Sequence, residues 1–129
     1  MGAKLFFSNT RADADLVSQI ADRLQRSGAA SSVLTDSMFE PGEAWAEQLR
    51  HALQDSDAVV VMLSESSSRS SMVMGEFGAA LVLQKPIIGL RSTSTAFPFT
   101  TTASNIHMVD TADMSADDIA KSIEHSLAE

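Results

Sequence analysis

The sequence predicts a three-layer α/β domain built around a five-stranded parallel sheet. Five short apolar segments alternate with segments of helical periodicity, which is the pattern of parallel strands joined by helical crossovers. The run over residues 57–63 is apolar and β-branched almost throughout, as a central strand covered on both faces requires. The chain has 129 residues, enough for one packed core, so we expect one domain over residues 1–129.

Residues 4–7 are expected to form the first strand, and the polar turn over residues 8–11 ends it. Residues 13–27 then carry apolar side chains at helical spacing with charged side chains between them, which predicts an amphipathic helix. Gly28 stands where a glycine commonly ends a helix, because glycine adopts the left-handed conformation without strain.

The second strand is expected over residues 31–35, around two apolar side chains. The loop that follows contains Pro41 and Gly42, which together are a strong breaker of regular structure. Helical periodicity resumes over residues 43–54, where Trp45 falls at core spacing. We therefore expect a second helix with Trp45 packed in the core.

The third strand leads into a serine-rich loop over residues 64–71 and then into a third helix. Ser70 or Ser71 is placed to cap the start of this helix. Glu76 falls one turn inside it, among residues that are otherwise small or apolar. The helix dipole alone favours an acid there, so the setting of Glu76 has to decide between a structural and a catalytic role.

The last third of the chain is expected to hold two more strands and a helix. Residues 85–90 and 105–110 are the fourth and fifth strands. Residues 91–104 between them show no periodicity, which fits either an irregular helix with a turn or a functional loop. Ser115 and Asp118 resemble a capping box at the start of the last helix.

A flavodoxin-like strand order of 2-1-3-4-5 is expected for this sheet. Ligands of such sheets bind at the carboxyl ends of the strands, at the switch point between strands one and three. The turn over residues 8–11 and the loop before Glu76 follow these two strands. We therefore expect the two segments to meet at one crevice.

The composition narrows the classes of partner. The 17 acidic and 9 basic side chains give a formal net charge of −8, which argues against nucleic acid and membrane as partners. The chain has no cysteine and its histidines fall in separate elements, so no metal site is expected. No apolar run has the length of a signal peptide core or a membrane span, and we expect a cytoplasmic protein.

Several short motifs, taken in their order and spacing, resemble the pattern of TIR domains over about residues 4–90. The pattern is a first strand ending in Phe-x-Ser, an aspartate after the second strand, a Pro-Gly loop before a tryptophan, and a third strand followed by Leu-Ser, Ser and Glu. The matching residues are Phe6-Phe7-Ser8, Asp36, Phe39-Glu40-Pro41-Gly42, Trp45, Leu63-Ser64, Ser70, Glu76 and Lys85-Pro86-Ile87-Ile88.

TIR domains are either adaptors that signal by assembling or enzymes that cleave NAD at the nicotinamide–ribose bond. The resemblance implies that Glu76 is the catalytic residue, with NAD as substrate and no cofactor. Nicotinamide is already a cation in NAD and leaves as a neutral molecule, so one carboxylate suffices to stabilise the ribosyl oxocarbenium ion. The resemblance also implies nucleotide contacts from Ser8, Asn9, Thr10, Arg11, Phe39, Ser70 and Met72.

Self-association is a further implication of the resemblance. The loop before the second helix corresponds to the BB loop, through which TIR domains assemble and, in the family's enzymes, help to complete the site of a neighbouring copy. Its residues here are Asp36, Phe39, Pro41 and Gly42. A separate protein partner is also expected. The leading hypothesis is therefore an NAD glycohydrolase or cyclase that is active on self-association.

Two alternatives stay open. Many enzymatic members carry tryptophan four residues before the glutamate, whereas this chain has Met72, which we interpret as a packing residue. The first alternative is thus a non-catalytic signalling or scaffold module that binds other TIR domains or a nucleotide. The second follows from residues 75–91, which also resemble nucleoside 2-deoxyribosyltransferases, in which a glutamate attacks the sugar.

Overall fold

A computed structural model describes residues 2–39, 44–92 and 106–128 of the chain. Its helices and strands follow one another in the order β1 (Ala3–Ser8), α1 (Ala14–Arg26), β2 (Ala30–Thr35), α2 (Trp45–Asp55), β3 (Ala58–Leu63), α3 (Ser71–Val82), β4 (Ile87–Arg91), β5 (Ile106–Asp110) and α4 (Ala116–Leu127). Three single 3-10 turns lie between them, namely η1 (Arg11–Asp13), η2 (Asp36–Met38) and η3 (Ser67–Arg69).

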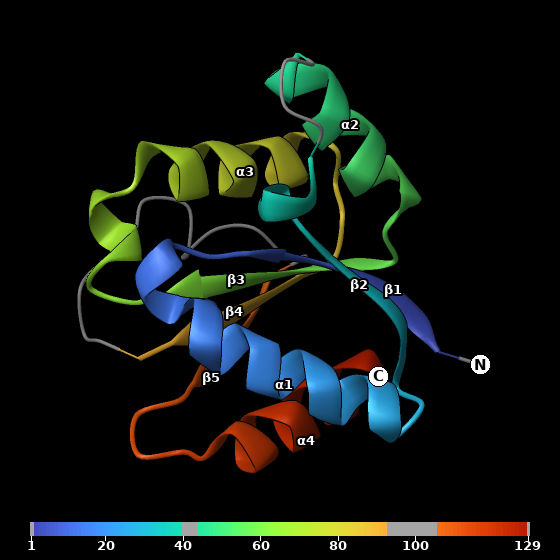
Figure 1. Cartoon of the computed structure of the whole chain (residues 1–129), viewed down its shortest axis with the longest axis vertical. Coiled ribbons are helices and arrows are strands. Elements are labelled where there is room, and N and C mark those ends of the chain that lie inside the picture. The colour runs from blue at the N-terminus through green and yellow to red at the C-terminus, as the bar shows by residue number, and fades with distance from the viewer. Residues whose placement is uncertain (1, 40–43, 93–105, 129) are drawn as a thin grey trace.

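The five strands form one sheet in the order β2-β1-β3-β4-β5, and every neighbouring pair runs parallel. The sheet lies between two helical layers, with α2 and α3 on one face and α1 and α4 on the other (Figure 1). The predicted fold class and the flavodoxin-like strand order are confirmed. The carboxyl ends of β1 and β3 lie side by side, because Ser8 pairs with Val61.

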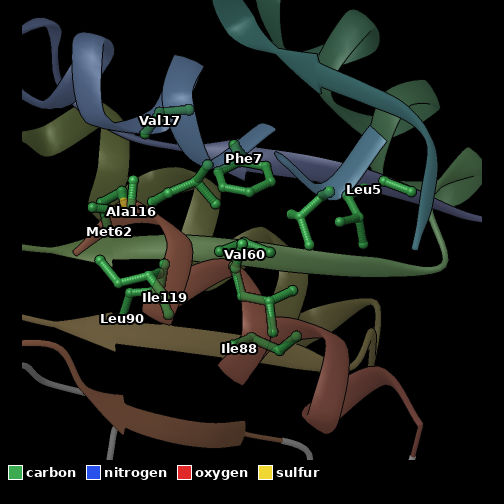
Figure 2. Close-up of a cluster of buried hydrophobic side chains, with 14 of the residues drawn as sticks. Leu5, Phe7, Val17, Val60, Met62, Ile88, Leu90, Ala116 and Ile119 are labelled. Carbon is green, nitrogen blue, oxygen red and sulfur yellow. The ribbon is translucent and has the colours of Figure 1, made fainter. Parts of the chain in front are cut away.

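Alternate residues along the strands pack into two hydrophobic cores, one on each face of the sheet. The side chains that face α1 and α4 come from Leu5, Phe7, Val60, Met62, Ile88 and Leu90, and Figure 2 shows them packed with Val17, Ala116 and Ile119. The strand residues between them, among which Phe6, Val59 and Val61 have no exposed surface, pack with α2 and α3 instead. β3 is buried on both faces, as its unbroken apolar sequence predicts.

Three helix-end residues lie as their chemistry predicts. The hydroxyl oxygen of Ser70 accepts a hydrogen bond from the Val73 amide at 3.2 Å, and that of Ser115 accepts one from the Asp118 amide at 3.1 Å. Gly28 follows α1 with a φ of +83°, a conformation that glycine adopts without strain. The start of α3, and with it the position of Glu76, is therefore fixed by a side-chain cap.

One predicted strand begins later than expected, because its first residues belong to the turn before it. The fourth strand, expected from Lys85, begins at Ile87 because α3 is followed by a turn that contains a left-handed residue, Gln84, with a φ of 57°. The Lys85 amide then bonds to the Ala80 carbonyl at 3.1 Å and belongs to the helix end. Most of the unpatterned segment over residues 91–104 lies outside the described residues.

Two side chains expected in the core are partly exposed. Trp45 is 40% exposed, because it stands in the first turn of α2, where its ring lies over Gly75, a residue without a side chain to cover it. Met72 is 49% exposed, because it lies in the first turn of α3 on the side away from the buried Val73. Both were wrongly interpreted as packing residues.

No helix among the described residues is both long and apolar enough to cross a membrane.

Candidate active site

The candidate site is built around the carboxyl group of Glu76, which lies in the interior of the protein. Ser8 ends β1 and Glu76 lies on the inward face of α3, and neither has any exposed surface. The Ser8 hydroxyl donates a hydrogen bond to Glu76 Oε1 at 2.5 Å, across 68 positions of the sequence. Residues of α3 that point the same way, such as Val73 and Phe77, are apolar and buried. Glu76 is thus a polar exception on a core-facing helix surface.

A second carboxyl group approaches from β2. Asp36 follows Thr35, the last residue of β2, which pairs with Phe7 of β1. Asp36 is therefore level with Ser8 at this edge of the sheet. Among the described residues, the buried oxygens Asp36 Oδ2 and Glu76 Oε2 have no hydrogen-bond partner. Two ionised carboxylates offer each other acceptors alone, so such a pair stays without a hydrogen bond until one of them carries a proton.

These surroundings raise the pKa of Glu76 from 4.5 to about 8. The largest cause is burial, which disfavours the charged form, and the neighbouring Asp36 carboxyl group adds to it. The hydrogen bond from Ser8 acts in the opposite direction, because it stabilises the carboxylate. A carboxyl group whose pKa departs this far from its ordinary value, at the carboxyl ends of the strands, is a candidate for catalysis.

A cluster of hydroxyl groups ties together the segments that follow β1 and β3. Asp13 Oδ2 accepts a hydrogen bond from the Ser64 hydroxyl at 2.6 Å. The hydroxyls of Thr10 and Ser66 are bonded to each other at 2.7 Å. Because Thr10 follows β1 and the two serines follow β3, these bonds hold the two segments at a fixed separation. The prediction that these two segments meet at one crevice is confirmed.

A cavity of about 470 Å³ opens beside this cluster. Its polar wall comes from the segments after β1 and β2 and from the cap of α3, and its apolar wall from the first turns of α1, α2 and α3. The described lining residues are Asn9, Thr10, Arg11, Ala14, Val17, Thr35, Asp36, Ser37, Trp45, Ser70 and Met72. Glu76 is fully buried and is not among them, whereas Asp36 is. The cavity therefore reaches the carboxyl pair from the side of Asp36.

The structure places most of the candidate contact residues in this cavity wall. Asn9, Thr10, Arg11, Ser70 and Met72 line it. Asn9 also donates from its side-chain amide to the Thr10 carbonyl at 2.8 Å, which makes this turn compact.

Two groups of candidate residues lie elsewhere or are not described. Phe39 is half-buried and stacks on Phe6, with ring centroids 6.1 Å apart and an interplanar angle of 25°. It is not among the described lining residues. The candidate assembly residues Pro41 and Gly42 lie outside the described residues.

Sequence reasoning missed two parts of the site. It named Asp36 for self-association alone, although an aspartate directly after strand two must lie near the end of strand one in the order 2-1-3. It also missed Trp45 as a cavity wall, for which the sequence holds no direct signal, since helical spacing placed this ring in the core. Among the described residues, no group of three or more histidine, aspartate or glutamate side chains is arranged to hold a metal ion.

Comparisons with known proteins agree with this architecture. The family model of the TIR domain matches residues 5–126. The structure of a CMP N-glycosidase from Clostridium botulinum is similar with a TM-score of 0.70 and 15% identity, over 95% of this chain and 98% of that chain. The flavodiiron core of Flv1 from Synechocystis is similar with a TM-score of 0.55 and 12% identity, over 99% of this chain and 36% of that chain. No curated protein sequence matches.

Proposed function

The chain belongs to the TIR domain family, and on that premise we propose that it cleaves the nicotinamide–ribose bond of NAD, by hydrolysis or cyclisation, as a self-associated assembly. Glu76 is the essential carboxylate in this proposal. One observation carries it, namely that Glu76 is buried, hydrogen-bonded to Ser8 at 2.5 Å and set at the switch point of the sheet beside a cavity with polar and apolar walls. A buried acid is costly to keep unless it has a task.

Cleavage of the nicotinamide–ribose bond requires few protein groups besides the Glu76 carboxylate. Cleavage of the bond between C1′ of the ribose and the nicotinamide nitrogen leaves positive charge on the sugar, while the base departs neutral. An ionised Glu76 stabilises that charge, and the low dielectric around it strengthens the interaction. Water then attacks C1′ and releases a proton to the solvent, which gives the hydrolysed product. Alternatively, a ring nitrogen of the adenine of the same molecule attacks C1′, which gives the cyclic product.

The cavity walls fit a dinucleotide in their chemistry. Arg11 is the basic residue among the described lining residues and is available to a phosphate. Asn9 and Thr10 offer hydrogen-bonding groups to ribose hydroxyls. Trp45 lies in the same wall as Met72 and offers an aromatic face to a planar base. Many enzymatic relatives have a tryptophan at the position of Met72, and in this proposal Trp45 takes over the role of that residue.

Loss of NAD by the purified protein tests the proposal. We expect the parent protein to release nicotinamide at high protein concentration, and the Glu76→Gln variant to release none, since a neutral amide cannot stabilise an oxocarbenium ion. Chromatography of the products separates ADP-ribose from its cyclic form. Glu65→Gln is the matched control, because Glu65 has a side chain that is 78% exposed and pairs with Arg69 on the surface. This control should retain the parent's activity.

Intact NAD in every concentrated preparation would contradict the enzymatic proposal. A second candidate function, a non-catalytic module that binds a nucleotide or other TIR domains, would then take precedence. The observation in its favour is that Glu76 has no exposed surface and does not line the cavity. Nucleotide binding that is equal in the parent and in Glu76→Gln, with no turnover in either, is the result expected for such a module.

A third candidate follows from the similarity to a CMP N-glycosidase. A nucleotide with a neutral base needs a proton on its leaving group, unlike NAD. The same chromatographic assay with CMP and with deoxynucleosides in place of NAD distinguishes this reaction, which would release free cytosine or another base. Release from these substrates but not from NAD would assign the chain to that class of reaction.

A further inference from the structure

We infer that Asp36 is a positioning residue for Glu76, and that the two carboxyl groups share one proton across the edge of the sheet. The inference concerns a residue that the family resemblance connected with assembly alone. Its consequence for turnover rests on the proposed function, whereas the shared proton itself can be observed without any activity.

The register of the sheet brings the two groups to the same place. Thr35 pairs with Phe7, so the next residues along the two strands, Asp36 and Ser8, are neighbours. Leu34 packs in the core on the α2 and α3 side, and Asp36, two residues later, continues on that side. Glu76 reaches the same spot from α3 and bonds to Ser8 there.

The hydrogen-bond inventory leaves room for one proton. Glu76 Oε1 is satisfied by Ser8, while Glu76 Oε2 and Asp36 Oδ2 are both buried and have no partner among the described residues. Leaving two buried carboxylate oxygens without donors costs free energy. One proton placed between them supplies a donor to the pair and removes the repulsion of two adjacent negative charges.

The other groups around Glu76 neither replace this proton nor neutralise the pair. β3 and α2 present apolar side chains to α3, such as Val61, Leu63 and Leu53. From β1, the Ser8 hydroxyl is a donor that already serves Oε1. Arg11 lines the cavity, but no hydrogen bond or ion pair joins it to either carboxyl group among the described contacts. Among the described residues, no other group therefore supplies the donor that these two carboxyl oxygens lack.

Asp36 thus governs how much of Glu76 is ionised. In the proposed reaction the ionised form stabilises the ribosyl cation, so turnover should rise with pH as the shared proton leaves. Replacing Asp36 by asparagine removes the competing charge and offers an amide donor to Glu76, which lowers its pKa. Replacing Ser8 by alanine removes a donor to the carboxylate and raises it. The two variants therefore have effects of opposite sign.

A carboxyl titration followed by ¹³C NMR tests the inference on the whole chain. The Glu76 resonance is identified by its loss in Glu76→Gln. In the parent protein we expect the Glu76 carboxyl signal to titrate with a midpoint near pH 8. In Asp36→Asn the Glu76 midpoint should fall by about one pH unit or more, and in Ser8→Ala it should rise. Asp22→Asn, which removes an equal charge from the exposed face of α1, is the matched control and should leave the midpoint unchanged.

The outcomes separate this inference from the proposed function. A Glu76 signal that titrates as an ordinary carboxyl group in the parent, or that Asp36→Asn leaves in place, overturns the shared proton, and the parent curve decides this even if a variant does not fold. If the Glu76 midpoint shifts in the expected directions but neither the parent nor any variant cleaves NAD, the shared proton is supported and only the proposed enzymatic function is contradicted. In an active protein the pH profile of kcat should move with the NMR midpoint, and a loss of rate in Asp36→Asn with no such movement overturns the positioning role.

Discussion

Glu76 shows at the scale of a single residue how a buried acidic group weakens the fold that holds it. Its side chain lies among apolar neighbours, and its pKa is raised to about 8, which means that folding disfavours the charged form. A glutamine has the same shape, accepts the hydrogen bond from Ser8 and can donate to Asp36. The residue that best suits the folded state is therefore not the residue present, a conflict that the proposed catalytic role of Glu76 would explain.

This conflict predicts a pH-dependent gain in stability for Glu76→Gln. Between pH 4.5 and about 8 the folded parent holds a proton on Glu76 that the unfolded chain has lost, so its free energy of unfolding falls as the pH rises through this window. The glutamine variant does not titrate there. We expect it to be more stable than the parent by about 4 kcal/mol at pH 8 and equally stable at low pH, where both side chains are neutral.

Urea unfolding of the parent and Glu76→Gln across this pH range measures the difference directly. Other titrating groups are common to the two proteins, so most of their contribution cancels in the comparison. Glu65→Gln, which alters an exposed side chain, serves again as control and should follow the parent at every pH. A stability difference that is constant with pH would contradict the raised pKa of Glu76.

At the scale of the element, the start of α3 determines where Glu76 points. The Ser70 hydroxyl accepts from the Val73 amide, and the next turn of the helix carries Glu76. Met72, in the same first turn, faces the cavity and is exposed rather than packed. One helix turn therefore supplies the cap, a cavity wall and the buried acid, and a change at its first residue should be felt in all three.

Two serine caps among the described residues offer a matched pair of substitutions. Ser70→Ala and Ser115→Ala each remove a side-chain acceptor from a helix N-terminus, and each should lower the free energy of unfolding by about 1 kcal/mol. We expect a loss of NAD turnover in Ser70→Ala alone, because α4 lies on the opposite face of the sheet (Figure 1). Denaturant unfolding and the chromatographic assay measure the two effects. Equal activities in the two variants would mean that the cap does not position Glu76.

At the scale of the whole molecule, the excess of acidic side chains opposes assembly. Each copy carries a formal charge of −8, so two copies repel each other at long range. Salt screens this repulsion, with a screening length of about 10 Å at 0.1 M ionic strength. If the assembly is the active form, turnover per molecule should rise with protein concentration, and at fixed concentration it should rise with ionic strength.

NAD cleavage at saturating substrate, measured beside sedimentation velocity, checks this expectation. Saturation removes the weakening effect that salt would have on the proposed binding of a phosphate at Arg11. The controls are dilution series at constant ionic strength, in which specific activity and the fraction of assembled protein should fall together. A specific activity that stays constant over dilution would identify a single copy as the active form and contradict the assembly proposal.

The sequence by itself determined the sheet, its strand order and the helix caps. The strands, the helices and the caps follow from local chemistry, since apolar runs, periodicity and serine caps are read over a few neighbouring residues. The strand order was expected from the alternation of strands and helices, which is typical of flavodoxin-like sheets. It also singled out Glu76, because an acid on an otherwise apolar helix surface is visible as a local exception. The position of the site at the carboxyl ends of β1 and β3 followed from the strand order.

The tertiary structure alone decided what surrounds Glu76. The bond from Ser8 spans 68 positions, and the approach of Asp36 depends on the register of β1 and β2, neither of which local periodicity encodes. The exposure of Trp45 and Met72 has the same origin, because helical spacing gives the direction of a side chain but not whether the opposing element reaches far enough to cover it. Ionisation depends on burial and on distant neighbours brought close, so the raised pKa of Glu76 is a property of the folded chain.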